Sequence, residues 1–192
     1  MQLTPPQVNR FYGIWFPLLR FVNQKRKVID ETLLRTESLN PNDAAVVRNS
    51  LWSDDRLLED FVCENPAALS DADLAVVKSW RFRVSGTFLV VKHLKKYSVL
   101  VSGESSGSEG PKVYGVVGLN CPLEDILFDL PCMIKATLIP FEGTITYDSL
   151  FTSYPIILGR NITGTLNRDY QRAKKRGTII ESLGRADLAI VR

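Results

Sequence analysis

The chain has 192 residues, of which 45% are hydrophobic, 23% charged and 9% aromatic, and its formal net charge is +3. These values exclude a disordered tail, a collagen-like fibre and a disulfide scaffold, and no apolar run approaches the roughly 20 residues that cross a bilayer. They are typical of one globular domain, or of a small domain with an appendage.

Residues 1–79 are predicted to be helical. Thr4 can cap a helix that begins at Pro5, apolar residues then recur at helical spacing as far as Val22, and Pro17 is expected to kink or split this helix. The aromatic stripe is expected to form core, or an arm that packs against a second chain in a homo-oligomer. Cap and proline signals predict further helices over about 40–51, 53–64 and 70–78.

From Trp80 onward, β-branched and aromatic residues alternate with turn signals, which predicts five or six short strands, the last over 154–158. The Gly-, Ser- and Pro-containing run over 102–112 is predicted to be a loop that connects two of them. Phe141-Glu142-Gly143 is predicted to be a hairpin turn. A helix is expected over about 166–176, ended by Gly177, and the segment 178–183 is expected to return to the sheet.

We therefore predict an α+β fold. Its N-terminal helices would pack on a C-terminal antiparallel sheet or small partly open barrel with a late basic helix. The predicted divisions are a helical part over 1–79, a β-rich part over 80–183 and a tail over 184–192.

Charge is distributed unevenly along the chain. Residues 1–79 have a balance of −2 and residues 80–192 a balance of +5, and the segment 160–176 alone carries +5. Four- and three-residue spacing would place several of its cations on one helical face. The candidate binding residues are Arg168, Arg172, Lys175, Arg176, Lys95 and Lys96.

Two interpretations of this segment remain open. It is either a solvated amphipathic helix that packs Leu166, Tyr170 and Ala173 on the sheet, or a phosphate-binding surface for nucleic acid or an acidic protein. In the second case Tyr97 and Tyr147 would stack on bases. No RNA-recognition or helix-turn-helix signature accompanies the charge.

Catalytic chemistry has few candidates, because the chain has one histidine and lacks the phosphate-loop, dinucleotide-binding, zinc-protease and nucleophile-elbow motifs. A proton-transfer site is conceivable only if four side chains converge. The alternative is that Asp148 caps the hairpin loop, Tyr147 packs with its hydroxyl bonded nearby, and the histidine lies at the surface or at the end of a strand. These weak catalytic candidates are Asp148, Tyr147, Glu142 and His93.

The cysteines, Cys63, Cys121 and Cys132, form no CxxC or CxC pair, so we expect no metal site and no cofactor. Unclustered cysteines and the absence of a signal-peptide pattern at the N-terminus predict a reducing, cytosolic location and no membrane partner.

Several short strings also occur together between residues 45 and 183. They include Leu51-Trp52, Glu64-Asn65-Pro66, Lys78-Ser79-Trp80, Gly86-Thr87-Phe88, Lys92-His93-Leu94-Lys95-Lys96-Tyr97, Tyr114-Gly115-Val116 and Leu138-Ile139-Pro140-Phe141-Glu142-Gly143. The set resembles a family of uncharacterised bacterial and archaeal proteins whose domain also occurs fused to SEC-C zinc motifs. The resemblance implies no activity, and this chain lacks the CxC of the fused members.

Taken together, these features favour a non-enzymatic cytosolic interaction or regulatory module that binds nucleic acid or an acidic partner through the basic helix. The alternative is a hydrolase- or nuclease-like enzyme that uses the four weak catalytic candidates.

Overall fold

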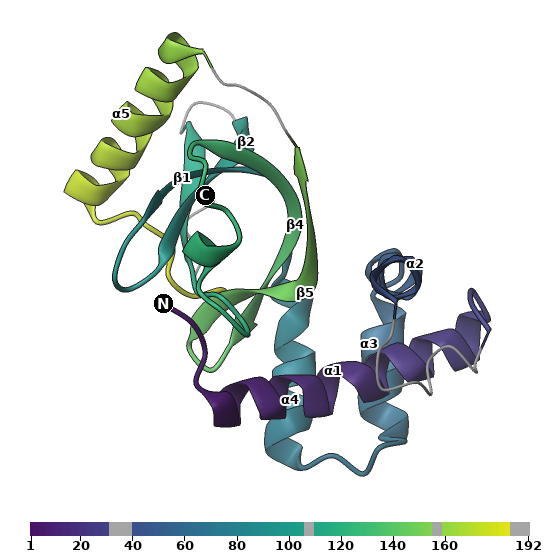
Figure 1. The fold of residues 1–192 in the computed structure, drawn as a ribbon. Helices are drawn as coiled ribbons and strands as arrows, with labels where there is room; N and C mark the ends of the chain where they lie inside the picture. Colours follow the sequence, from purple (N-terminus) through teal and green to yellow (C-terminus); the bar gives the residue numbers. More distant parts are fainter. Residues whose placement is uncertain (31–39, 106–109, 155–158, 185–192) are drawn as a thin grey trace. The chain divides into compact units, whose positions relative to one another are not determined.

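The computed structural model describes residues 1–30, 40–105, 110–154 and 159–184 (Figure 1). The chain divides into two compact units, a helical unit over Pro5–Arg81 and a barrel unit formed by Met1–Thr4 with Phe82–Arg192. The α+β class is confirmed, and the boundary lies just beyond the predicted position after residue 79. None of the helices in the described ranges has the length and apolar character needed to cross a membrane.

The helical unit contains α1 (Pro5–Arg26), α2 (Pro41–Trp52), α3 (Arg56–Glu64) and α4 (Asp71–Ser79), followed by the 3₁₀ turn η2 (Trp80–Phe82). Local signals in the sequence set most of these boundaries. Asn40 caps α2 by accepting a hydrogen bond from the Asn42 amide at 2.9 Å, and Ser70 caps α4 by accepting one from the Asp73 amide. Pro17 lies inside α1, which continues past it, so of the two predicted alternatives, a kink or a split, the split is wrong.

The aromatic stripe of α1 forms the core of the helical unit. Trp15 is 1% exposed, stacks on Trp52 with ring centroids 5.9 Å apart, and meets Trp80 edge-on at 5.6 Å. The ring centroid of Phe11 lies 6.0 Å from the ring centroids of both Trp15 and Trp80. These rings therefore pack against one another inside the helical unit, in agreement with the core interpretation of the stripe.

The barrel unit contains β1 (Val84–His93), β2 (Ser98–Ser105), β3 (Pro111–Val116), β4 (Cys132–Phe141) and β5 (Thr144–Tyr154). The 3₁₀ turn η4 (Leu123–Asp125) lies between β3 and β4, and α5 (Arg160–Arg176) follows β5. The strands run in the order β1-β2-β3-β5-β4, and β4 pairs with β1 again, which closes the barrel (Figure 1).

The β3–β5 joint is parallel, so the sheet is mixed and the predicted antiparallel pairing is wrong at this joint. The joint rests on one residue pair, Val116 opposite Ile145. On the same edge of β3, Ile180 pairs opposite Tyr114. Ile180 exchanges backbone hydrogen bonds of 2.8 Å with Val113 and Gly115, which confirms the predicted return of residues 178–183 to the sheet.

At the other end of the same seam, the N-terminal residues pair beyond β3. The Leu3 amide donates to the Gly118 carbonyl at 2.9 Å, and the Gly118 amide donates to the Met1 carbonyl at 3.1 Å. Residues 1–3 therefore belong to the barrel, although the helical pattern begins immediately after them.

Three element boundaries differ from the prediction. β5 runs on through Tyr154, where a separate strand was expected over 154–158, and residues 155–158 lie outside the described ranges. α5 begins at Arg160 rather than near Leu166. The expected 102–112 loop is shorter, because β2 continues to Ser105 and β3 begins at Pro111, and residues 185–192 of the predicted tail lie outside the described ranges.

Candidate functional site

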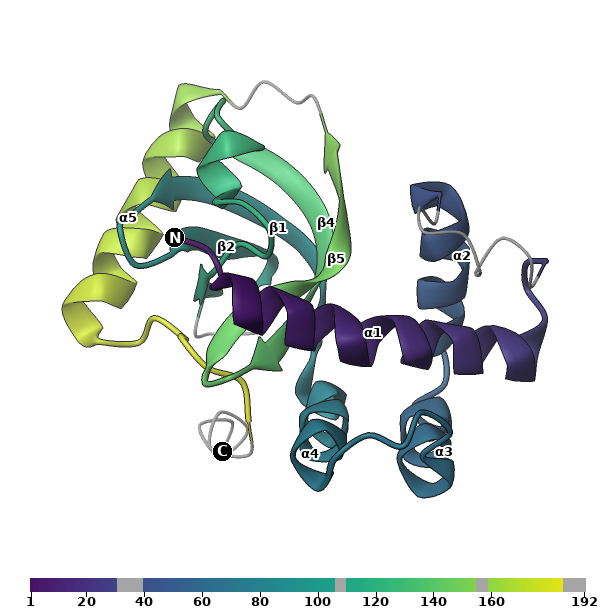
Figure 2. The same cartoon turned by 60° about the horizontal axis from the view of Figure 1, so that its bottom comes forward.

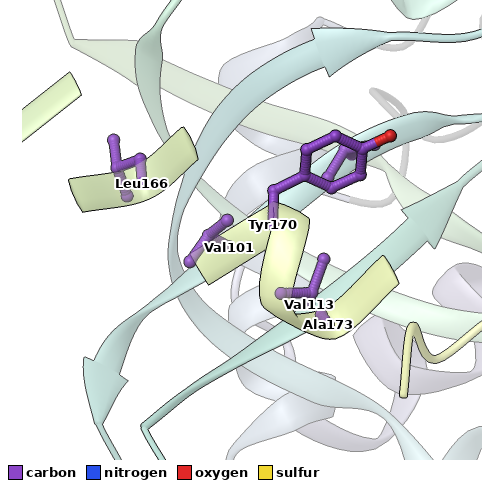
Figure 3. Close-up of a cluster of buried hydrophobic side chains, with 6 residues drawn as sticks. Val101, Val113, Leu166, Tyr170 and Ala173 are labelled. Atoms are coloured by element: carbon purple, nitrogen blue, oxygen red, sulfur yellow. The ribbon is translucent and has the colours of Figure 1, made fainter. Parts of the chain in front are cut away.

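One face of α5 is buried against the outer surface of the barrel. Leu166, Tyr170 and Ala173 are 3–8% exposed and pack on strand residues, as Figure 3 shows. Their four- and three-residue spacing places them in one stripe. The buried partners on the strands are Val99, Val101 and Val113. This packing is the arrangement that the amphipathic interpretation predicted.

The cations of α5 repeat with the same four- and three-residue spacing, but they lie two positions later in the sequence. This offset places them on the opposite face of the helix. Arg168, Arg172 and Lys175 each follow a buried residue by two positions, and two residues turn an α-helix by about 200°. All three are exposed. Burial of the apolar stripe therefore directs these side chains into solvent, and the two interpretations of the sequence describe two faces of one helix.

Few acidic groups accompany these cations. The Arg168 guanidinium donates to the Thr165 hydroxyl at 2.9 Å, and Arg172 Nη1 lies 3.5 Å from a carboxylate oxygen of Asp169. Arg172 remains 60% exposed in this loose contact. The carboxylate therefore leaves most of the Arg172 guanidinium accessible to an anion in solution.

The last turn of α5 adds Lys174, Lys175 and Arg176. Cations are favoured there because the helix dipole is negative at its C-terminus. Gly177 ends the helix with φ 67°, a left-handed conformation that glycine adopts without steric cost. The predicted glycine stop is confirmed.

The turn between β1 and β2 lies beside α5. Leu94 and Tyr97 pack against the cluster that contains the buried face of the helix, and Figures 1 and 2 both show this turn next to α5. Lys95 and Lys96 in the turn are exposed. We use the term basic surface for Arg168, Arg172, Lys175 and Arg176 of α5 together with Lys95 and Lys96.

One acidic residue of the C-terminal segment contacts this surface. Glu181 forms an ion pair with Lys96, and Lys96 stays 72% exposed. Burial raises the pKa of Tyr97, and the neighbouring Glu181 carboxylate raises it further. The Tyr97 ring lies over Gly115, where an added Cβ would approach it to 2.9 Å, so Gly115 leaves the room that the ring fills.

Glu181 is a site residue that the sequence did not indicate. It lies 85 positions from Lys96 along the chain. The strand pairing of the preceding residue, Ile180, with β3 brings it there. No motif or periodicity marks such a long-range contact.

The four weak catalytic candidates do not converge. Tyr147 pairs opposite Leu138, which pairs opposite Val84, the first residue of β1, whereas His93 is the last residue of that ten-residue strand. At about 3.3 Å per residue, this separation prevents hydrogen-bond contact between His93 and Tyr147. The condition on which the enzyme hypothesis depends is not met for the histidine.

Each of these side chains has a structural setting. Glu142 and Gly143 form the β4–β5 turn with φ 48° and 77°, as expected for a two-residue hairpin turn. Asp148 is fully buried and Tyr147 is 7% exposed, with its ring edge-on to Phe151 at 5.4 Å. Because Tyr147 is buried, the prediction that it stacks on bases is wrong.

His93 connects the end of β1 to two neighbours. Nδ1 lies 2.7 Å from the Ser98 hydroxyl, and Nε2 lies 2.7 Å from the Leu127 carbonyl oxygen. Because a carbonyl only accepts, Nε2 carries the hydrogen and donates it to Leu127. Both ring nitrogens are engaged, which agrees with the strand-end interpretation of this residue.

Within the described ranges, no three His, Cys, Asp or Glu side chains gather as metal ligands, and all three cysteines are free.

No family model matches the chain, and neither a curated protein nor a solved structure matches it. The resemblance to the family with SEC-C fusions therefore stays a prediction.

Proposed function

We propose that the chain is a non-enzymatic module that binds nucleic acid through the phosphate backbone, using the basic surface. The observation that carries this proposal is the exposed row of cations on α5, directed outward by the burial of the opposite face. Arginine and lysine side chains on one exposed face attract phosphates and release their counterions, which makes binding independent of sequence and dependent on salt.

The barrel adds an argument at the level of the fold. Its strand order and its parallel β3–β5 joint are shared with OB-fold barrels, which bind oligonucleotides over β2 and β3. Here α5 covers the outer face of those strands. In this chain, the outward face of α5 would therefore contact the oligonucleotide in place of the surface of β2 and β3. This is an analogy of fold, and fold alone does not define function.

Phosphate contact is favoured over base stacking. Tyr170 is 3% exposed beneath α5, and Tyr147 is buried in β5. The exposed groups of the surface are guanidinium and ammonium groups. We further propose that the module acts in the cytosol, where its free cysteines stay reduced.

The test is the salt dependence of binding to a fluorescently labelled single-stranded oligonucleotide, measured by anisotropy. Replacing Arg168, Arg172 and Lys175 with alanine removes three cations of the surface. Each phosphate contact contributes about 0.7 to the slope of log affinity against log salt, so the slope should fall by about 2.

The matched control removes three exposed cations elsewhere, with Arg20→Ala, Lys78→Ala and Lys135→Ala. It should bind almost as the wild type does. Equal losses in both variants, or no binding by the wild type, would overturn the proposal. Equal binding of polyglutamate and the oligonucleotide would also overturn it, in favour of an acidic protein partner.

A further inference from the structure

The connection between β3 and β4 carries the most exposed large apolar side chain in the described chain. Phe128 is 76% exposed, and Ile126, two positions earlier, is 41% exposed. A phenylalanine left in water does not gain the stabilisation that burial of its apolar surface would contribute. We call residues 122–131 the acidic loop, because this segment holds three acidic residues and no basic ones.

The acidic loop is fixed to the barrel. Leu123 is 1% exposed and Leu127 is 6% exposed, so two of its side chains are anchored in the core. The Leu127 amide donates to the Leu123 carbonyl at 2.8 Å, and the Leu127 carbonyl accepts from His93. Ile126 and Phe128 therefore point outward on either side of a buried residue.

The charges around this apolar pair indicate what would cover it. Glu124, Asp125 and Asp129 are exposed and surround Ile126 and Phe128 in sequence. An apolar centre with a charged rim is the usual anatomy of a protein interface, and large aromatic side chains are its common anchors. The complementary surface would be apolar at its centre and basic at its rim.

This chain carries such a surface on α5. A shallow hollow of about 250 Å³ is lined by Asn161, Ile162, Thr165 and Leu166, and Ile162 is 50% exposed. Arg168 and Arg172 follow on the next turns of the helix. We propose that the acidic loop of one chain docks on α5 of a second copy, with Phe128 at the hollow and its acidic neighbours on these arginines.

The contact has to form between two copies. In Figure 1 the short turn of η4 lies in front of the barrel, well separated from the first turn of α5. Because Leu123 and Leu127 are buried, the loop cannot cross to its own helix without leaving the core. Two reciprocal contacts would close a two-fold dimer, whereas unreciprocated contacts would extend into a chain of molecules.

This inference does not depend on nucleic-acid binding, although it uses part of the same basic surface. An added oligonucleotide that binds the surface should compete with self-association. Self-association that persists without any oligonucleotide binding would leave the dimer standing and the proposed function overturned.

The experiment measures molar mass against protein concentration by light scattering and sedimentation at low salt. The wild-type mass should rise with concentration toward a dimer or higher species. Phe128→Ser should raise the dissociation constant at least about tenfold, as expected for an interface anchor, and Phe128 is exposed enough for the fold to tolerate it.

The matched control is Phe16→Ser, at a 42% exposed phenylalanine of α1, which should associate like the wild type. Charge reversal gives the decisive arm. Asp125→Lys with Asp129→Lys in one variant, and Arg168→Glu with Arg172→Glu in another, should each stop self-association, and mixing the two variants should restore it.

Three results would overturn the inference. These are a wild-type chain that stays monomeric, self-association that survives Phe128→Ser, and charge-reversed variants that do not associate when mixed. Loss of self-association in Phe16→Ser alone would assign the contact to the N-terminal helix.

Discussion

The helical unit and the barrel unit use their charged side chains differently. In the helical unit, cations meet acids, most of them on other helices or loops: Arg10 with Asp73, Lys25 with Glu64, Arg26 with Asp54 and Arg56 with Asp54. In the barrel unit, Lys96 pairs with Glu181, and Arg172 lies loosely beside Asp169.

Four cations of α5, one in its middle and three in its last turn, have no such partners within the described ranges. Arg168, Lys174, Lys175 and Arg176 form no ion pair there. The small net charge of the chain, +3, therefore conceals an uneven use of cations in the two units. The helical unit pairs Arg10, Lys25, Arg26 and Arg56 with its own acids. In the barrel unit, α5 presents a row of cations to solvent, where an external anion can bind them.

The largest expected effect is on the stability of the helical unit, and it tests whether the aromatic side chains of this unit form its core. Trp15→Ala removes a side chain that is 1% exposed and packs on two other tryptophans. Truncation of a buried tryptophan typically costs about 3–5 kcal/mol, so urea unfolding should show a loss of that size.

Substitutions in the basic surface should have a much smaller effect on stability in the same urea-unfolding measurement. The variant with alanine at 168, 172 and 175 should unfold within about 1 kcal/mol of the wild type, because surface substitutions away from packed features change stability little. A loss as large as that of Trp15→Ala would break the comparison, since it would make these cations structural.

A smaller effect is expected where the barrel unit does pair a cation. The Glu181 carboxylate contacts Lys96, and it also raises the pKa of Tyr97. Because Glu181→Gln removes this carboxylate, the pKa of Tyr97 should fall toward its usual range. Oligonucleotide affinity should rise a few-fold, and the salt slope should increase by about 0.7 as Lys96 becomes available. Ultraviolet titration and anisotropy measure the two quantities.

Glu59→Gln is the matched control, because it removes one exposed carboxylate of the helical unit. It should leave both the Tyr97 titration and the affinity unchanged. An unchanged affinity in Glu181→Gln, together with a lowered Tyr97 pKa, would remove Lys96 from the binding surface.

The smallest effect concerns an ion pair of the helical unit. Hydrogen bonds from Arg56 lower the pKa of Asp54 to about 2. A lowered pKa means that the stabilising contribution is present above the unfolded value near 4 and is lost as the pH falls through about 2. The stability difference between wild type and Asp54→Asn should therefore shrink over this range.

Nuclear magnetic resonance titration of the Asp54 carboxyl group checks the pKa itself. A titration midpoint close to the pKa of an aspartate in an unfolded chain would show that Asp54 does not keep its contact with Arg56 in solution. The comparison between the units would then lose one of its paired cations.

Local signals in the sequence predicted much of the fold. Asn40 and Ser70 mark helix starts and Gly177 marks a helix end, because caps satisfy backbone groups within a few residues of themselves. Continuous apolar residues over Val99–Val101 agree with a strand buried on both faces, one inside the barrel and one under α5. The candidate cations were likewise predicted from their helical spacing.

Other features depended on partners distant in sequence. His93, Tyr147 and Asp148 were grouped by residue type, and the strand register separates the histidine from the other two. Glu181 was missed, because nothing near it in the sequence indicates Lys96 as a neighbour.

By itself, the sequence determined the order of helices and strands, the buried stripe of α5 and the cations opposite that stripe, since these follow from helical and strand periodicity. Only the tertiary structure decided how the barrel closes. Gln2 and Ile180 lie far apart in the sequence, yet Ile180 pairs along the edge of β3 that faces β5, and Gln2 pairs with the extension of this edge at Gly118. Such pairing satisfies backbone groups that carry no side-chain signature, so no local pattern records it.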